Sequence, residues 1–336
     1  MQRYGMTIPL AGVPLSEQRD WVRELADLGY TDLWTAEADA TDGFTPLALA
    51  SQWAPEARLG CAIHPVYTRG PALLAMSAAS LAQAAPGRFV LGLGSSSNVI
   101  VENWNGIPFE KPYQRVRDTV RFLRRALGGE KVSEDYETFS VKGFRLGLSL
   151  DEPPKILVAA LRQGMLRLAG READGAILNW LSADDVKTVA PIVHDAGRQA
   201  AEGRAQRGEA ERSHKDKELV ARIFVCPTPD ADAARGLGRM AVNAYLNVPV
   251  YAAYHDWLGR QEELAGMWKL WSEGDRKGAA AAIPDRVVDE LIVHGPPEKC
   301  REQIQRYVDN GVDTPALMLL PFGSDPRQAS RDLAPR

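Results

Sequence analysis

The sequence predicts a single (β/α)8 TIM barrel of the α/β class with two insertions. Eight short apolar segments alternate with eight helical segments, and most connections between them are short. Segments such as 156–159 are apolar throughout, as expected of parallel strands that are covered on both faces. The rival fold is a doubly wound open sheet, which would favour a Gly-x-Gly-x-x-Gly turn near the N-terminus. No such turn occurs there: Gly92 and Gly94 come in the fourth unit and lack the third glycine.

The first half of the chain contains four strand-helix units. Ser16 can cap the first helix and Gly29 can end it, while Pro46 falls near the first position of the second helix, where its missing N–H costs nothing. Pro86 and Gly87 end the alanine-rich third helix. We expect strands over 4–10, 31–35, 58–63 and 89–93, and the last three helices over 45–53, 72–84 and 112–127.

The second half contains four more units and two interruptions. We expect strands over 155–160, 175–178, 218–225 and 314–320, and helices over 164–173, 182–207, 231–245 and 296–310. The stretch 128–150 holds an alternating run, 136–141, which is typical of a small hairpin. The stretch 246–284 is rich in aromatic residues and predicts a helical insertion or lid. One barrel domain is therefore expected over 1–325, followed by a polar, loose tail over 326–336.

Composition disfavours several classes of partner. The net charge is −4 and no basic block occurs, which argues against nucleic acid. No apolar run reaches about 18 residues, so we expect no membrane span. The N-terminal segment is soon broken by Pro9 and does not resemble a signal peptide, which favours a cytoplasmic protein. Cys61, Cys226 and Cys300 are far apart and odd in number, which indicates a reducing compartment, and the first two are expected to be buried packing residues.

The expected carboxyl ends of the strands carry polar residues, and in a barrel these ends form the functional face. The ends supply Glu37 and Asp39, His64, Ser95 to Ser97, the segment 161–163, and Asn179. This set is poor in nucleophiles and metal ligands. The five histidines (64, 194, 214, 255 and 294) show no metal-binding spacing, so no metal is expected. No Gly-x-Ser-x-Gly elbow is present either.

Three long segments carry a resemblance to a known family. They read G-C-A-I-H-P-V-Y-T-R-G-P over 60–71, P-G-R-F-V-L-G-L-G-S-S-S over 86–97, and G-M-L-R-L-A-G-R-E-A-D-G-A-I-L-N-W over 164–180. The chain resembles the bacterial-luciferase-like superfamily over most of its length, in the branch that uses the deazaflavin coenzyme F420. The motifs are more specific for the superfamily than for the choice between F420 and FMN.

The resemblance implies where a coenzyme would bind. A non-proline cis peptide between Ala62 and Ile63 would form a bulge behind the coenzyme ring. Ser95, Ser96 and Ser97 match positions beside the ring, and Glu37 and Asn179 are further expected contacts. Leu161, Arg162 and Gln163 match the segment that holds the coenzyme phosphate. Physical chemistry agrees on this last point, because a helix N-terminus favours an anion and Arg162 could add a charge, although a solvated turn is the alternative for Arg162.

The candidate catalytic residues are Glu37, His64 and Ser97. In related deazaflavin dehydrogenases the serine positions look like Thr-Gly-Glu, and the Glu37-Ala38 pair is often Asp-His. This chain therefore lacks both the glutamate and the histidine base. These departures weaken an assignment as an alcohol or sugar-phosphate dehydrogenase, because such reactions need a base at the hydroxyl.

The resemblance implies an F420-dependent oxidoreductase that transfers a hydride between the deazaflavin C5 and a small organic substrate. The missing base favours a reductase acting on an activated double bond or imine. Two alternatives stay open: an FMN-dependent luciferase-like monooxygenase, and a coenzyme-binding protein without catalysis. The insertion 246–284 is expected to cover the substrate side, and the family suggests a homodimer.

Overall fold

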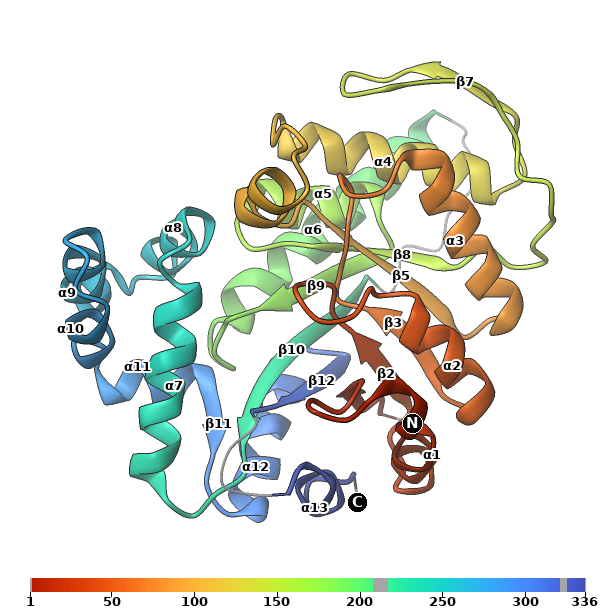
Figure 1. Cartoon of the computed structure of the whole chain (residues 1–336). Helices are drawn as coiled ribbons and strands as arrows, with labels where there is room; N and C mark the ends of the chain where they lie inside the picture. The colour runs from red at the N-terminus through yellow and green to blue at the C-terminus, as the bar shows by residue number, and fades with distance from the viewer. Residues whose placement is uncertain (1, 208–216, 321–324, 336) are drawn as a thin grey trace.

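The computed structural model describes residues 2–207, 217–320 and 325–335, and it contains a closed barrel of parallel strands (Figure 1). Pairing of β12 with β1 and of β9 with β10 closes the circle. The predicted barrel is confirmed, since every barrel strand overlaps its expected segment. The barrel strands are β1 (Gly5–Thr7), β2 (Asp32–Thr35), β3 (Arg58–Cys61), β5 (Phe89–Gly94), β8 (Lys155–Ala159), β9 (Gly175–Asn179), β10 (Glu218–Cys226) and β12 (Thr314–Leu319).

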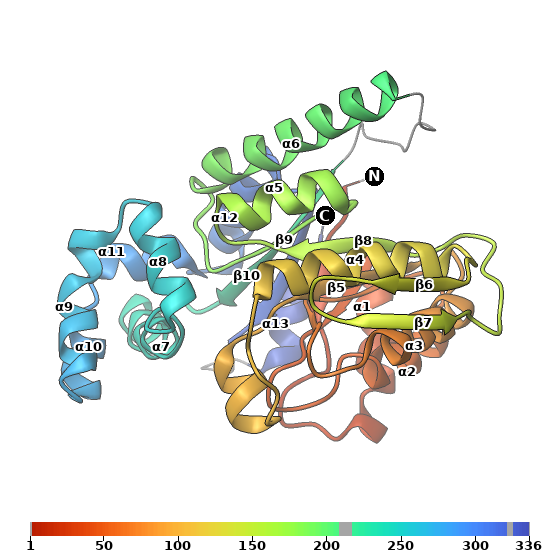
Figure 2. The same ribbon diagram turned by 90° about the horizontal axis from the view of Figure 1, so that it is seen from above.

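Helices cover the outside of the barrel (Figures 1 and 2). In α4 the apolar residues Val116, Val120 and Leu123 are buried while most of its arginines remain partly exposed, so its amphipathic pattern explains how it packs. No helix in the described part of the chain is both long and apolar enough to span a membrane. The surrounding helices are η1 (Leu15–Glu17), α1 (Arg19–Asp27), α2 (Thr45–Trp53), α3 (Pro71–Ala84), η2 (Val99–Trp104), α4 (Pro112–Leu127), α5 (Gln163–Glu172), α6 (Val186–Gln206) and α12 (Pro297–Asp309).

The first insertion is the expected hairpin, with strands β6 (Val132–Asp135) and β7 (Ser140–Phe144) paired antiparallel beside α4 (Figure 2). The alternating run at 136–141 spans mostly the turn rather than a strand. The Tyr136 amide donates to the Phe139 carbonyl at 2.9 Å and closes that turn. The two rings pack on each other and on Phe122 of α4, so the alternation in the sequence reflects this aromatic packing.

The second insertion is helical, as predicted. It follows α7 (Ala231–Tyr245) and comprises α8 (Pro249–Trp257), α9 (Gln261–Ser272) and α10 (Arg276–Ala281), which project from one side of the barrel (Figures 1 and 2). The sequence did not predict the next two elements, α11 (Asp285–Leu291) and β11 (Ile292–His294), which extends the sheet beside β10. These helices bury an apolar core of their own, which meets the barrel at Trp180 and Phe224.

The prediction of a loose C-terminal tail is wrong for the residues that the structure describes. They form α13 (Pro326–Asp332), which packs beside α1. Trp21 Nε1 donates to the Ser330 hydroxyl at 3.3 Å, and the Tyr30 hydroxyl donates to the Ser330 carbonyl at 2.8 Å. This helix has too few apolar positions to produce a helical period, so only the tertiary contacts reveal it. The last residue of the predicted tail, 336, lies outside the described residues.

A buried ionic network closes the N-terminal end of the barrel. The Arg58 guanidinium donates to Glu218 Oε1 at 2.6 Å and Oε2 at 2.9 Å, to the Thr314 hydroxyl at 3.1 Å, and to Asp32. Each of these four residues is the first of its strand. Every charge in the network has a partner, which is the condition under which buried ions are tolerated.

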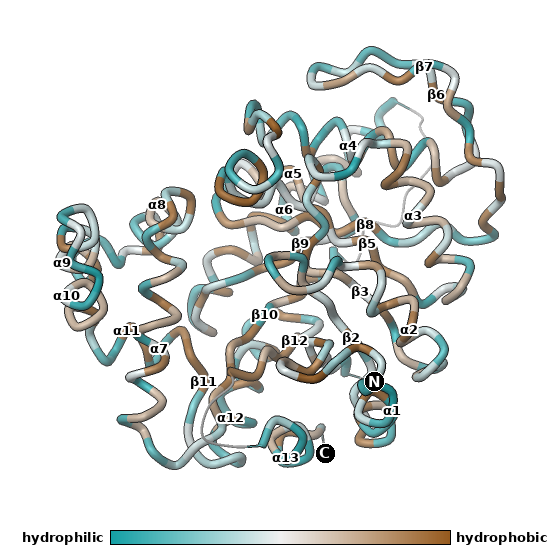
Figure 3. Tube along the Cα trace, in the orientation of Figure 1, coloured by the Kyte–Doolittle hydropathy of each residue, from teal (hydrophilic) through white to brown (hydrophobic). Residues whose placement is uncertain are grey.

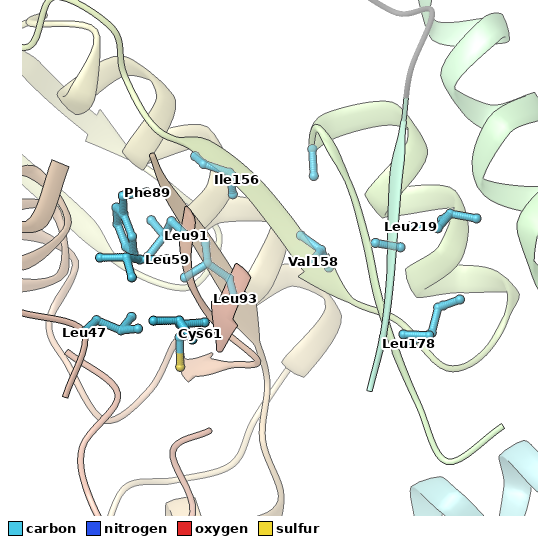
Figure 4. Packing of buried hydrophobic residues seen from close by; sticks show 14 of the residues in the cluster. Leu47, Leu59, Cys61, Phe89, Leu91, Leu93, Ile156, Val158, Leu178 and Leu219 are labelled. Atoms are coloured by element: carbon cyan, nitrogen blue, oxygen red, sulfur yellow. The ribbon is translucent and has the colours of Figure 1, made fainter. Parts of the chain in front are cut away.

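Side chains alternate between the barrel interior and the surrounding helices. The outward residues, among them Leu91, Leu93 and Val158, join the main core with Leu47 of α2 (Figure 4). Along the tube the barrel strands are largely hydrophobic, whereas outer helices such as α9 and α13 carry hydrophilic stretches (Figure 3). One inward layer is an apolar plug formed by Trp34, Val90, Leu157, Ile177, Val220 and Ala316.

The next inward layer, two residues further along each strand, is different. It contains Ala36, Gly92 and Ala159 on one side, and Asn179 and Arg222 on the other. Small side chains on one side leave space above the apolar plug. The C-terminal end of the barrel is therefore open where the N-terminal end is closed.

Glycine at position 92 is required by a close approach between β3 and β5. A Cβ atom at this position would lie 1.9 Å from the Cys61 carbonyl oxygen and 2.6 Å from Ile177 Cδ1. Gly94 has a similar constraint, since its Cβ would lie 2.9 Å from Ile63 Cγ1. The end of β3 can reach into the barrel only because β5 carries no side chains there.

We predict that Gly92→Ala lowers the free energy of unfolding by at least about 2 kcal/mol, because the added methyl group must displace backbone. Gly147→Ala is the matched control, since its Cβ would meet nothing within 4 Å, and it should change stability by under about 1 kcal/mol. Urea or guanidinium unfolding of both variants tests this. Equal stability of the two variants would contradict the steric argument.

Candidate active site

A cavity of about 850 Å³ opens at the C-terminal ends of the barrel strands. All predicted site residues except His64 line it: Glu37, Ala62, Ile63, Ser95, Ser96, Ser97, Leu161, Arg162, Gln163 and Asn179. The fold thus brings together five strand ends that are far apart in the sequence. Two tryptophans near these strand ends do not line the cavity: Trp104 is exposed, and Trp180 is buried against Phe224.

One wall of the cavity is the bulge at the end of β3. The Ala62–Ile63 peptide bond is cis, as the resemblance implied, and both residues face the cavity. The Ala62 amide donates to the Thr35 carbonyl at 2.7 Å, and the chain then re-enters the sheet as β4 (His64–Pro65) beside β5. The bulge is therefore held from both sides and presents a small apolar surface.

The three serines after β5 form the neighbouring wall. Ser96 has a positive φ of 62°, so the chain turns sharply here. Ser97 precedes η2: its hydroxyl accepts from the Ile100 amide at 3.4 Å, and its carbonyl accepts from the Val101 amide at 2.9 Å. These serines offer hydroxyl groups to a ligand and no ionisable group.

The N-terminus of α5 forms a third wall, which can hold an anion. Arg162 caps the helix with extended backbone (φ −109°, ψ 169°), and no side chain caps the first amides. Residues 161–165 all line the cavity. The free N–H groups and the helix dipole favour a phosphate or carboxylate at this end.

Glu37 accepts hydrogen bonds from three donors. They are the Gly43 amide at 2.9 Å, His64 Nδ1 at 3.2 Å and Arg69 Nη1 at 2.5 Å. Burial would raise the pKa of Glu37, but these hydrogen bonds outweigh it and lower the pKa from 4.5 to about 2. Glu37 is therefore a carboxylate at neutral pH, with no proton to donate and little strength as a base.

His64 lies behind the cavity wall. It is fully buried, and its ring stacks on Phe44 with a centroid distance of 3.8 Å. Burial lowers the pKa of His64 more than Glu37 raises it, so the neutral ring donates its Nδ1 proton to Glu37. The sequence placed His64 at the right strand end, but the turn that follows the bulge directs it away from the ligand space. In this geometry His64 positions Glu37 and does not reach the cavity.

Sequence reasoning missed Arg222 and its neighbours. Arg222 of β10 pairs in register with Asn179 of β9, and both line the cavity. Asn179 Nδ2 donates to the Tyr251 hydroxyl at 3.0 Å. The available signal was a charged residue in the middle of an apolar strand, two positions beyond an inward-facing Val220. The pairing of Arg69 with Glu37 was also missed, since it depends on two loops meeting.

The second insertion covers one side of the cavity, as expected for a lid-like segment. Helix α8 contributes Val250, Tyr251, Ala253, Asp256 and Trp257 to the lining. In the described part of the chain no group of three or more His, Cys, Asp or Glu side chains is placed to hold a metal ion, and His214 lies outside that part.

The fold and the site define a closed (β/α)8 barrel whose C-terminal face holds a cavity large enough for a coenzyme. The chain belongs to the luciferase-like monooxygenase family, whose sequence model matches residues 3–314. It is 28% identical to a putative coenzyme F420-dependent oxidoreductase of Mycobacterium tuberculosis, over 96% of this chain and 94% of the relative.

Two solved structures share the fold. The coenzyme F420-dependent tetrahydromethanopterin reductase of Methanopyrus kandleri superposes with a TM-score of 0.79 at 18% identity, covering 99% of this chain and 97% of the other. The oxygenating constituent of 3,6-diketocamphane monooxygenase of Pseudomonas putida, a type II Baeyer-Villiger monooxygenase in complex with FMN, gives 0.65 at 17% identity, covering 99% and 96%. At these identities the likeness establishes the fold alone.

The Glu37 hydrogen bonds generate a prediction on stability. The pKa of Glu37 is depressed in the folded state, so its contribution is present above the unfolded pKa and is lost as the pH falls from about 4.5 towards about 2. Glu37→Gln should therefore lower the free energy of unfolding at pH 7 by roughly 2–3 kcal/mol, and the deficit should shrink at pH 3. Chemical unfolding at both pH values measures it. The exposed Glu262→Gln on α9 is the control, and a deficit at pH 3 as large as at pH 7 would refute the assignment.

Proposed function

We propose that this protein is an F420-dependent oxidoreductase that transfers a hydride between the deazaflavin C5 and a small organic substrate. The observation that carries the proposal is that one cavity contains the cis bulge, the three serines and the open N-terminus of α5. The similarity to a relative named as F420-dependent over nearly the whole chain supports the choice of coenzyme.

The residues present fit such a coenzyme. Ala36, Ala62 and Ala159 leave room for a flat ring beside Ile63, and the free amides at 163–165 suit a phosphate. When bound, the deazaflavin supplies a two-electron hydride carrier. Ala62 and Ile63 would support one face of the ring, Ser95 to Ser97 would contact its edge, and Arg162 would add charge to the phosphate site.

The protonation states of the groups in and behind the cavity favour a reductase. Glu37 is held as a carboxylate by three donors, and His64 is neutral and does not reach the cavity. Ser97 stands where an acid would serve a dehydrogenase. Among the described residues, the site thus has no strong general base, which suits reduction of an activated double bond or imine with water or a serine hydroxyl as the proton source.

The alternative is an FMN-dependent monooxygenase, which the family's name and the FMN-bound structural neighbour favour. The same bulge and the same helix N-terminus would accept the FMN ring and phosphate. A coenzyme-binding protein without catalysis is a third reading, because the acid and the histidine base are both absent. The expected homodimer stays a prediction.

Coenzyme titration tests the proposal. We expect the purified protein to bind F420 at least about tenfold more tightly than FMN, followed by fluorescence, and to transfer a hydride from reduced F420 to an acceptor with an activated double bond or imine. Tight FMN binding with oxygen consumption, and no F420 binding, would refute the proposal. Tight F420 binding without transfer across a broad acceptor panel would support the third reading.

The phosphate site has its own test. Arg162→Gln should weaken F420 binding about 3–30-fold, because one charge-assisted hydrogen bond to the phosphate is lost, and the loss should shrink at high salt. Arg167→Gln, an exposed arginine on the same helix, is the matched control and should leave affinity unchanged. If both variants bind F420 equally tightly, Arg162 lies on a solvated turn and does not contact the phosphate.

A further inference from the structure

We propose that Arg222 binds a carboxylate of the substrate, so that the substrates of this protein are small organic acids with an apolar body. That an anion binds beside Arg222 rests on the geometry of the cavity. That this anion belongs to the substrate rests on the proposed function. Four observations lead to it: the direction of the side chain, its lack of a partner, a second donor beside it, and its position opposite the coenzyme walls.

The direction of Arg222 follows from strand alternation. Val220 belongs to the apolar plug inside the barrel, so Arg222, two residues later, also points inward. It lies in register with Asn179, whose neighbour two residues earlier, Ile177, belongs to the same plug. Arg222 and Asn179 thus form part of the floor of the cavity, directly above the closed interior.

Among the described residues, Arg222 has no hydrogen-bond or ion-pair partner. Its Nε atom is buried and unpartnered, and its guanidinium lies 5.3 Å from the centre of the Phe224 ring. Two carboxylates line the cavity, but neither pairs with it: Glu37 is held by Arg69, and Asp256 is exposed on α8. Burial lowers the pKa of Arg222, yet an arginine stays charged. Arg222 is half-buried. A partly desolvated cation without a counter-charge is costly, and a bound anion removes that cost.

A second donor faces the same space. The Tyr251 hydroxyl accepts a hydrogen bond from Asn179 Nδ2, which leaves its own proton free to donate. Tyr251 is close enough to Arg222 for the two groups to influence each other's pKa. A guanidinium and a hydroxyl donor together match the two oxygens of a carboxylate.

The position in the barrel assigns this anion to the substrate rather than to the coenzyme. The strands run in the order β3, β5, β8, β9, β10, so β10 lies across the eight-stranded barrel from the β3 bulge. The bulge, the serines and the α5 N-terminus belong to β3, β5 and β8. Arg222 faces them from the side that α8 covers. Val248, Val250 and Trp257 line that side, and they suit an apolar body next to the carboxylate.

The test uses the coenzyme-free protein with cinnamate and its neutral analogue cinnamamide, titrated by calorimetry at low salt. We expect wild type to bind cinnamate at least about tenfold more tightly than cinnamamide, which is the range for a charge-assisted hydrogen bond. Arg222→Met should remove that preference, and Arg222→Lys should retain part of it. Arg198→Met, an exposed arginine on α6, is the matched control and should behave as wild type. Equal binding of the two probes by wild type overturns the proposal without reference to any variant.

Measuring F420 affinity distinguishes a failure of the carboxylate-site proposal from a failure of the proposed function. Arg222→Met should keep F420 affinity within about threefold of wild type, because the coenzyme walls lie across the barrel. If Arg222→Met abolishes F420 binding and leaves cinnamate binding intact, Arg222 belongs to the coenzyme site and the proposal is overturned. If wild type prefers cinnamate but does not bind F420, the carboxylate site stands and the proposed function fails.

Discussion

The site depends on one close approach between two strands. The Cys61 carbonyl oxygen lies where a side chain on β5 would stand, and glycine at position 92 leaves room for it. Because β3 can reach this far inward, the next two residues, Ala62 and Ile63, form the bulge that walls the cavity. Gly94 allows Ile63 to pack, and the serines that follow Gly94 then stand beside the bulge. The two cavity walls that we propose to hold the coenzyme, from β3 and β5, thus result from the same packing constraint.

The two ends of the barrel each contain a strand arginine, but among the described residues only the one at the N-terminal end is paired with carboxylates. At the N-terminal end, Arg58 is fully engaged by two carboxylates and a hydroxyl, and it ties β2, β3, β10 and β12 together. At the C-terminal end, Arg222 lies on the same strand as Glu218 but meets no acid in the described structure. A paired buried charge serves the closed end, whereas a half-buried unpaired charge suits anion binding at the open end. This contrast is what separates the structural face from the functional face in this chain.

The sequence was sufficient for features that depend on local pattern. Continuous apolar runs located the barrel strands, and the shared direction of parallel strands grouped Glu37, Ser95 and Asn179 at one face before any contact was known. Features that depend on tertiary contacts were missed. Whether Arg222 points inward depends on which alternate residues of β10 face the barrel interior, and the sequence does not fix this. The pairing of Glu37 with Arg69 depends on two loops meeting. Helix α13 was missed because it is too short to show a period.

The distribution of charge connects the binding sites with the proposed chemistry. Glu37 is neutralised by Arg69. In the part of the chain that the structure describes, the cationic groups that line the cavity without an ion pair are Arg162, beside the α5 N-terminus, and Arg222 on the opposite side. Two separated cationic sites suit two anions, a coenzyme phosphate and a substrate carboxylate, with the reacting atoms between them. With the coenzyme anchored through its phosphate and the substrate through its carboxylate, the reacting atoms are oriented for hydride transfer without a general base. Such a site can act through positioning, which is consistent with a cavity whose β5 end carries Ser97 and its neighbouring serines.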